Sequence, residues 1–385
     1  MNIMKSYCPI NGIVLLLGAV LSLSGCYKEV QKISPGLVKG GSVSVDFATP
    51  GIGSETEIVG RGADGERDTE VPVTRAVTAL DEDVTVRIIA YRSSAGNPSA
   101  VNYVQDMTYV MRSGGLVPCK VDGNGNYEAL DQSSRMRLQP GDYDFYAITP
   151  ALPLADLIKV NVAHGVDYAG SLTASRTIAD DSPSATVTLA TLERQCSQLS
   201  FSTVIRNSDR IANIQPHSIT VGRLTSSPVA LRVGEGIGLG SDNGSYFFPE
   251  SAFVKGTEFG QFFCEEEVLP SSESFSFSMS VTFNEAPLAT ELATGFIDLP
   301  FEKGKRYNFA IELKNDKILL NLQITPWNTD AVWDAPDVGE PPYACVVVGM
   351  WQIESWQVGI GGFFVPVITS GSWTVDSDWS SEMGG

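Results

Sequence analysis

The sequence predicts an all-β protein built from two β-sandwich domains. Apolar and polar residues alternate with a period of two in segment after segment, as expected of strands that bury one face. Gly and Pro account for 58 of the 385 residues, more than the roughly 12% of an average protein, and this excess favours many short turns. A chain of this length has room for two domains, each with its own core.

The clearest strand runs from Phe275 to Phe283, where every second residue is apolar and the residues between are mostly Ser. Wound as a helix, this segment would scatter its rings around every face, so a half-buried strand explains the pattern. A turn at Asn315–Asp316 separates two alternating runs and predicts a hairpin. Leu154–Val160 is the one segment with a possible helical period. Alternation predicts further strands at Val84–Ala90, Tyr103–Met111, Tyr143–Ala147, Tyr307–Leu313 and Ile318–Ile324.

We expect five parts along the chain. They are a signal peptide at 1–25, a lipidated segment with the first strand at 26–75, sandwiches at 76–192 and 193–335, and a C-terminal appendage at 336–385. A Pro- and Asp-rich connector leads into the appendage. The appendage is too short to enclose a core, so its strands must add to another sheet.

The N-terminus reads as an export signal that ends in a lipidation site. Lys5 precedes an apolar stretch, Ile13–Leu23, which is too short to span a bilayer stably. The tetrapeptide Leu23–Cys26 that ends it resembles a bacterial lipobox, in which Cys26 receives acyl chains such as palmitate. Each buried methylene adds about 0.8 kcal/mol to membrane binding, so several acyl chains hold a protein firmly. We therefore expect a precursor anchored to a membrane.

Four cysteines then remain in the body of the chain, with long gaps and no Cys-x-x-Cys motif. This spacing argues against zinc and redox motifs. Outside the cytoplasm, disulfides are permitted, and four cysteines allow three pairings. Free buried thiols are an equal alternative, so the sequence leaves open the state of Cys119, Cys196, Cys264 and Cys345.

The composition excludes several classes of function. With 26 Lys and Arg against 45 Asp and Glu, the net charge is −19, and a chain without a basic stripe repels nucleic acid. The two histidines, His164 and His217, belong to different predicted domains and suit turns or the surface. The acidic runs Asp180–Asp181 and Glu265–Glu267 suit solvated faces better than a hydrolytic pair. We expect no enzymatic activity, no cofactor and no metal ion.

Several features, taken in order, resemble the fimbrillin superfamily of lipoprotein-derived pilins. After the lipobox comes a lone alternating strand, with Val43, Val45 and Phe47 on one face. A polar linker, Gly51–Val73, leads to Thr74-Arg75-Ala76. The runs Arg137–Pro150 and Phe301–Trp327 look like the family's hairpins of the first and second domain. The resemblance covers nearly the whole chain and implies two transthyretin-like Greek-key sandwiches.

The resemblance also implies a route of assembly and a set of partners. A lipidated precursor reaches the outer membrane, and an Arg-specific protease cuts in the linker, here between Arg75 and Ala76, with Arg61 and Arg67 as alternatives. Removal of the strand with Val43, Val45 and Phe47 opens a groove that a strand of a neighbouring fimbrial subunit fills. The appendage would supply the donor strand, whose apolar residues are Val347, Trp351, Ile353, Phe363, Val365 and Val367.

Two readings of function follow from this sequence. The first is a structural subunit of surface fimbriae that polymerises by donor-strand exchange and mediates adhesion. The second is a surface lipoprotein that stays anchored through Cys26 and binds glycans on a face lined by the C-terminal tryptophans. An enzyme is a distant third. The Gly-rich C-terminus leaves open whether a fimbrial subunit of this kind would form a stalk, a tip, an accessory part or an anchor.

Overall fold

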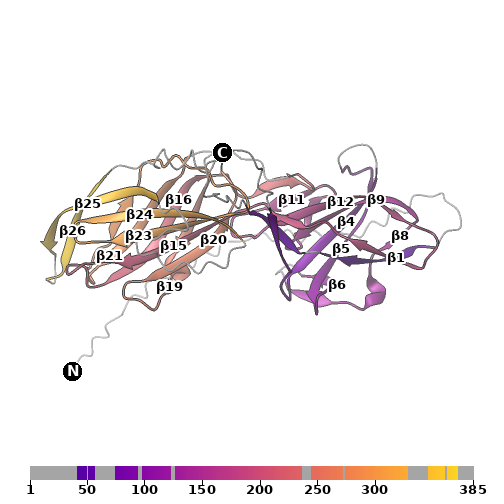
Figure 1. The fold of residues 1–385 in the computed structure, drawn as a ribbon, viewed down its shortest axis with the longest axis horizontal. Helices are drawn as coiled ribbons and strands as arrows, with labels where there is room; N and C mark the ends of the chain where they lie inside the picture. Colours follow the sequence, from indigo (N-terminus) through magenta and orange to yellow (C-terminus); the bar gives the residue numbers. More distant parts are fainter. Residues whose placement is uncertain are drawn as a thin grey trace, which may run out of the picture. The chain divides into compact units, whose positions relative to one another are not determined.

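The computed structural model describes residues 41–49, 51–56, 74–93, 98–122, 126–235, 244–271, 274–327, 346–359 and 362–371. In these ranges the regular elements are β-strands and two short 3-10 helices, η1 (Gln132–Ser134) and η2 (Glu250–Ala252) (Figure 1). The all-β prediction is therefore confirmed. Across the same ranges, no helix is long and apolar enough to cross a membrane.

The first sandwich pairs a large sheet with a small one. The large sheet has nine strands in the order β3 (Thr74–Thr78), β2 (Ile52–Thr56), β14 (Leu192–Arg194), β12 (Ala169–Ile178), β9 (Gly141–Thr149), β4 (Thr85–Arg92), β5 (Tyr103–Arg112), β6 (Gly115–Val121) and β7 (Tyr127–Ala129). The small sheet has three strands in the order β13 (Ser184–Thr188), β1 (Val43–Ala48) and β8 (Arg137–Leu138).

The core of the first sandwich forms where alternate residues of the two sheets meet. Val86, Ile88 and Ala90 of β4 are fully buried, as their spacing predicts, beside Phe145 of β9. The alternate residue of β4, Ile89, belongs to a different buried cluster. Both faces of this sheet are therefore covered at its centre, which explains why β4 reads as an almost continuous apolar run.

The second sandwich has the same two-layer plan. Its larger sheet has seven strands in the order β19 (Val254–Lys255), β20 (Phe262–Val268), β15 (Ser197–Ile205), β23 (Lys305–Leu313), β24 (Lys317–Pro326), β25 (Val346–Val358) and β26 (Phe364–Ser370). Its smaller sheet has four strands in the order β18 (Gly244–Pro249), β16 (Ile214–Leu224), β21 (Ser276–Phe283) and β22 (Thr290–Ala293).

Aromatic rings fill the core of the second sandwich. The ring of Phe201 on β15 stacks on Phe309 of β23 at 5.0 Å and on Phe277 of β21 at 5.5 Å. Phe248 of β18 meets the same ring edge-on at 5.4 Å. Such pairs add about 0.5–1.5 kcal/mol each beyond the burial of their area. These rings come from strands of both sheets and hold the two layers together.

A third buried cluster involves residues from both halves of the chain. It contains Tyr91 and Tyr146 from the first half and Leu231 and Trp327 from the second. A small sheet of β10 (Leu154–Asp156), β11 (Lys159–Val162) and β17 (Val229–Arg232) contributes to it. The segment with a possible helical period thus forms β10 and the start of β11, because pairing with β17 satisfies its backbone and buries Val160.

Neighbouring phenylalanines on β18 give a matched test of this core. Phe248 is 1% exposed and Phe247 is 56% exposed. We expect Phe248→Ala to lower the free energy of unfolding by about 3–5 kcal/mol, because it leaves a cavity among packed rings. Phe247→Ala should change it by no more than about 0.5 kcal/mol. Equilibrium denaturation of both variants checks this, and equal losses would contradict the packing described here.

Candidate assembly site

The first strand in the described ranges, β1, occupies the middle of a sheet. It pairs in parallel with β13, with Val45 opposite Ala185, and antiparallel with β8, with Val43 opposite Leu138 (Figure 1). The Val45 amide donates to the Met136 carbonyl at 2.8 Å. Without β1, the strands β8 and β13 would face each other across an open gap with unpaired backbone groups.

Three side chains of β1 point into the first core, as the alternation predicts. Val43 is 3% exposed, Val45 is fully buried and Phe47 is 6% exposed. The Phe47 ring meets Tyr109 edge-on at 5.6 Å and Phe145 at 5.3 Å. The strand therefore fills an apolar channel between the two sheets.

Polar groups at the surface fix β1 in this channel. Asp46, on its outward face, pairs with Arg135, which follows η1. The Arg137 guanidinium donates through Nε to the Ser42 hydroxyl at 3.2 Å. The walls of the channel are β8 and β13, which are two and five residues long. The sequence pattern does not reveal β13 and predicts β8 as part of a hairpin over Arg137–Pro150. In the structure β8 pairs with β1 in the small sheet, whereas β9 belongs to the nine-stranded sheet, and a strand of two residues carries no readable alternation.

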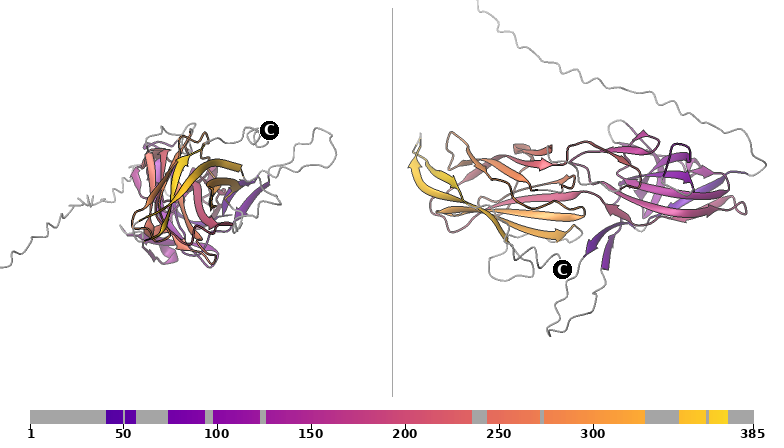
Figure 2. Two further views of the ribbon diagram at one scale, coloured as in Figure 1. Left: turned by 90° about the vertical axis from the view of Figure 1, so that its left-hand side faces the viewer. Right: turned by 90° about the horizontal axis from the view of Figure 1, so that it is seen from above.

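The predicted cleavage point lies in a β-hairpin at the rim of the nine-stranded sheet. Arg75 and Ala76 belong to β3, and Arg75 pairs with Glu55 of β2. β3 is the edge strand, and β2 joins the sheet through β14 (Figure 2). Gly51 sits before β2 with φ +113°, and a Cβ there would lie 2.1 Å from the Thr78 carbonyl oxygen. Cys26, Arg61 and Arg67 lie outside the described residues.

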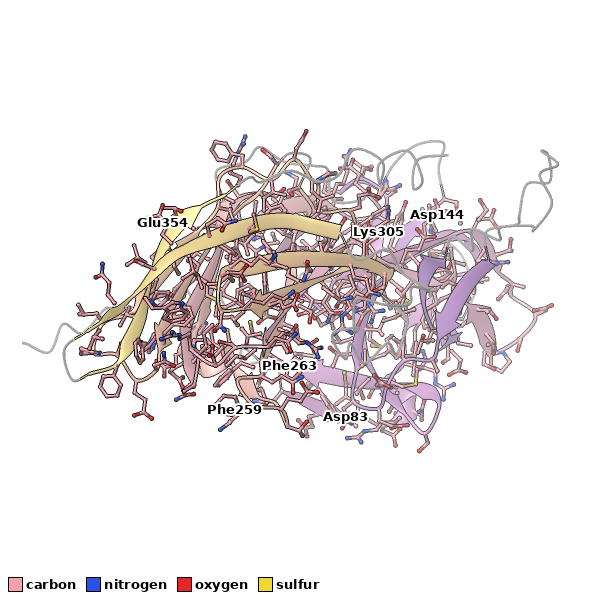
Figure 3. The ribbon with its side chains drawn as sticks, turned by 60° about the vertical axis from the view of Figure 1, so that its left-hand side comes forward. Asp83, Asp144, Phe259, Phe263, Lys305 and Glu354 are labelled. Carbon is pink, nitrogen blue, oxygen red and sulfur yellow. The ribbon has the colours of Figure 1, made fainter. Side chains whose placement is uncertain are left out.

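The C-terminal strands extend the second sandwich. β25 pairs antiparallel with β24, and β26 pairs with β25 as the outermost strand (Figure 2). Trp351 is 2% exposed and its indole N–H donates to the Ala293 carbonyl at 3.0 Å, while Ile353 is 8% exposed. These two donor candidates are thus part of the second core in this chain. Glu354, the residue after Ile353, is exposed on β25 (Figure 3).

The remaining donor candidates lie on a different face. On β26, Pro366 is buried and Ile368 packs against the second core. The alternate residues Val365 and Val367, like Phe363 just before the strand, are half-buried and by the period of two point away from that core. The side chain of Val347 lies outside the described residues.

The tryptophans and cysteines in the described ranges serve packing. The Arg194 guanidinium lies 4.6 Å from the Trp327 ring, and the Trp356 indole donates to the Asn315 carbonyl at 2.9 Å. With Trp351 buried, these three rings do not form an exposed platform. Burial raises the pKa of the Cys264 thiol to about 12, and the free, buried thiols in the described ranges are Cys119, Cys196 and Cys264. Cys345 lies outside them.

One cluster of titratable groups resembles acid–base machinery, but its geometry is structural. Both His164 nitrogens bond to the backbone, Nε2 with the Thr225 carbonyl and Nδ1 with the Leu269 amide, each at 3.0 Å. Burial lowers the pKa of His164, so the ring is a neutral bridge. His164 lies in a turn, as the sequence predicts, and is half-buried there. In the described ranges, no group of three His, Cys, Asp or Glu side chains could hold a metal ion.

Glu267 differs from the solvated carboxylate that its sequence context predicts. It is partly buried beside Glu266, and its backbone carbonyl accepts from the Gly165 amide at 2.7 Å. Burial, followed by the neighbouring Glu266, raises the pKa of Glu267 to about 7. Tyr246 donates to Glu266 at 3.0 Å. This environment penalises the charged form of Glu267.

The sequence of this all-β chain matches one known family. Residues 42–331 match the family described as fimbrillin-like, a span that includes the first sandwich with β1 and the second sandwich up to β24. The chain belongs to the fimbrillin-like family. As a member, it is a fimbrial subunit that works by contact with other subunits at the cell surface. Fimbrillin-like proteins are structural and adhesive, which agrees with the prediction of a non-enzymatic protein.

Solved structures resemble this fimbrillin-like chain in fold. A candidate cell adhesion protein from Bacteroides fragilis aligns with a TM-score of 0.53 and 19% identity, over 76% of this chain and 100% of that one. Candidate cell adhesion proteins from Bacteroides ovatus and Bacteroides uniformis give TM-scores of 0.48 and 0.41, both at 12% identity, over 76% and 75% of this chain and 100% and 99% of theirs. The first match supports the fold. No curated protein matches the chain in sequence.

The raised pKa of Glu267 predicts how stability depends on pH. The folded chain holds this proton up to about pH 7, whereas an unperturbed carboxyl releases it near 4.5. The free energy of unfolding should therefore fall as pH rises from about 4.5 to about 7. The Glu267→Gln variant has no carboxyl to titrate at this position, so its free energy of unfolding should not show this part of the decrease. The variant should therefore be more stable than the parent at high pH.

Thermal unfolding of parent and variant across this pH range measures the difference. Glu291→Gln, an exposed change on β22, serves as the matched control and should follow the parent curve. If the stability of the parent and of Glu267→Gln changes with pH in parallel, the pKa of this carboxyl is not shifted.

Proposed function

We propose that this fimbrial subunit is exported as a lipoprotein acylated on Cys26, cut between Arg75 and Ala76 by an Arg-specific protease, and polymerised by strand exchange into an adhesive fibre. One observation carries the proposal. The strand that cleavage would remove, β1, is a central strand whose apolar residues Val43, Val45 and Phe47 lie in the first core. Before cleavage, the lipid would hold the precursor at the outer membrane.

The burial free energy that the first sandwich would lose with β1 explains why another strand would fill the groove. Burying a Val or Phe side chain is worth about 1.5–3 kcal/mol, so the three residues together contribute roughly 5–9 kcal/mol. That is comparable to the total stability of a typical domain. Loss of β1 also unpairs the facing edges of β8 and β13. A sandwich in this state strongly favours an incoming strand with the same alternation.

The position of Arg75 suits a cut that frees β1. Arg75 lies on an edge strand, whose outer backbone groups have no partner strand in the described ranges. Proteases bind extended substrate through such backbone groups. A cut after Arg75 would separate β1 and β2 from most of β3, and the released piece would then be held only by non-covalent contacts, among them its pairing with β8, β13, β14 and the remainder of β3.

The donor strand that costs least to release is β26. It is the outermost strand, and its residues Val365 and Val367 are half-buried. Release of β25 would expose Trp351 and Ile353 and break the indole hydrogen bond to Ala293, at a cost of several kcal/mol. We therefore infer that β26 enters the neighbour's groove with Phe363, Val365 and Val367, while β25 stays in its own sandwich.

The cleavage site can be tested by replacing Arg75 in cells that make the fimbria. The parent should give a surface protein that starts at Ala76 and lacks lipid. Arg75→Ala should leave the lipidated precursor uncut, because the protease requires Arg, and should lower the yield of polymer at least tenfold. N-terminal sequencing and mass spectrometry of surface extracts measure both.

Arg61→Ala and Arg67→Ala are the matched controls and should mature as the parent does. A mature protein that starts at Gly62 or Asp68 would place the cut at one of these alternatives. A lipidated Cys26 on the assembled fibre would contradict the whole route and favour an anchored lipoprotein.

The donor assignment can be tested on β26. The double variant Val365→Asp/Val367→Asp should abolish polymer formation, because two carboxylates cannot enter an apolar groove without a large desolvation cost. Its own second sandwich should lose no more than about 1 kcal/mol, since both positions point away from the core. Size-exclusion chromatography after removal of the N-terminal segment measures polymer, and denaturation measures stability.

Gln357→Asp, an exposed change on β25, which stays in its own sandwich, is the control and should polymerise normally. If the double variant polymerises like the parent while Trp351→Ala does not, the donor is β25 rather than β26.

A further inference from the structure

The outermost strand of the seven-stranded sheet, β26, is held by more than its pairing with β25 (Figure 1). Ile368 packs against the second core, and Phe364 meets two residues from other parts of the sandwich. One of them, Asn284, directly follows β21, and the other, Arg210, lies between β15 and β16. These contacts join β26 to the body of its own sandwich, so they must break whenever the strand leaves.

The backbone carbonyl of Phe364 points to the free edge of β26. The Gly359 amide donates to the Phe363 carbonyl at 2.8 Å, so these two residues form a hydrogen-bonded pair. Such pairs alternate with non-hydrogen-bonded ones in an antiparallel ladder, and the next pair, Val358 with Phe364, is therefore of the second kind. Its backbone groups face away from each other. At this edge, the Asn284 Nδ2 donates to the Phe364 carbonyl at 2.8 Å.

Every hydrogen-bonding group of the Asn284 side chain is used. Its Nδ2 also donates to the Arg210 carbonyl at 2.8 Å, and its Oδ1 accepts from the Ala212 amide at 2.6 Å and the Asn213 amide at 3.2 Å. An asparagine amide offers two donors and two acceptor sites, so these bonds satisfy it completely. Asn284 is only 9% exposed, and water does not readily replace a lost partner at such a site. The bond to β26 is therefore part of a closed network.

The backbone explains which residue types suit this position. Asn284 has φ +51° and Glu285 has φ +58°, and the Ala286 amide donates to the Phe283 carbonyl at 2.9 Å. Positive φ at both central residues is typical of a type I′ turn, which favours Asn, Asp or Gly at the first of them. Of these three, only Asn has a side-chain N–H that can donate to a strand beside it.

The loop that Asn284 joins to β26 is itself anchored. The Ser208 hydroxyl and the Arg210 amide donate to the Asn315 Oδ1 at 2.7 and 3.1 Å. Asn315 lies in the turn between β23 and β24, and its carbonyl accepts from the Trp356 indole of β25 at 2.9 Å. The Arg210 guanidinium lies 5.3 Å from the centre of the Phe364 ring, within reach of a cation–π contact. The start of β26 is thus fastened to a firmly held part of its own sandwich.

We propose that Asn284 is a latch that holds β26 in its own sandwich and sets the rate at which this strand is released to a neighbouring subunit. The inference rests on the strand exchange proposed above and adds its control. Release requires that the bond from Asn284 to the Phe364 carbonyl breaks before β26 separates from β25. The Arg210 guanidinium adds a weaker second contact. Asn284 is a positioning residue, because it stays behind when the strand leaves.

Hydrogen exchange of the purified full chain tests the latch directly. Asn284→Asp suits the same turn and keeps an acceptor for the loop amides, but it replaces the donor by an oxygen that faces two carbonyls. Amides of β26 should exchange about tenfold faster than in the parent, a factor that corresponds to about 1.4 kcal/mol. Amides of β15 and β23 should keep the parent's rates, whereas a general loss of stability would speed their exchange as well.

Asn207→Asp is the matched control. Asn207 is exposed and has φ +49°, so the same substitution is made in the same backbone conformation, and this variant should exchange as the parent does. Arg210→Ala removes the guanidinium and keeps the backbone carbonyl, and it should speed the exchange of β26 about two- to fivefold. Thermal unfolding verifies that each variant folds, and Arg210→Ala carries the test if Asn284→Asp does not.

Polymer formation connects the latch to strand exchange. After the purified chains are cut with an Arg-specific protease, Asn284→Asp should form polymer about tenfold faster than the parent, and Asn207→Asp should match the parent, as followed by size-exclusion chromatography. Unchanged exchange of β26 in Asn284→Asp overturns the latch, and so does faster exchange with an unchanged rate of polymer formation. A cut parent that forms no polymer shows instead that strand exchange itself fails, and the latch falls with it.

Discussion

The arrangement of this protein depends on one pairing, that of β1 with β8 on one side and β13 on the other. Backbone hydrogen bonds on both edges and three buried side chains make β1 an integral part of the first core. β1 lies in the middle of its sheet but precedes the other described strands in sequence. A single cut after it would therefore separate it and leave the rest of the chain unbroken. The stability of the first sandwich therefore depends on a strand that fills the groove between β8 and β13.

The second sandwich has an open edge at its C-terminal strands. Strands β25 and β26 enlarge its sheet, but they differ in how firmly they are held. Trp351 ties β25 to the core through packing and a hydrogen bond, whereas β26 is paired on one side only. An edge strand with apolar residues on both faces would be a liability in a protein meant to stay monomeric. Under the proposed strand exchange, the same edge is the means of association.

Much of the fold was readable from the sequence because most strands bury one face. The alternation at Phe275–Phe283 and in the hairpin around Asn315–Asp316 predicted β21, β23 and β24 closely. The inward residues of β1 were readable for the same reason. Short strands at the edge of the groove, such as β8, carry no such alternation of apolar and polar residues. The burial of Glu267 and the bridging role of His164 depend on segments more than 50 residues away along the chain. The local composition, which favours solvent exposure, therefore did not predict these contacts.

The sequence by itself determined which residues face inward, since a period of two leaves one face apolar. It also predicts a lipidation site and a cleavage site, because such motifs are local patterns. Tertiary structure decided what those faces meet. It placed β1 between two strands from distant parts of the chain, and it turned Trp351 into the second core while Val365 and Val367 face away from that core. Pairing and packing between remote segments are set by the whole chain folding together, and no local pattern encodes them.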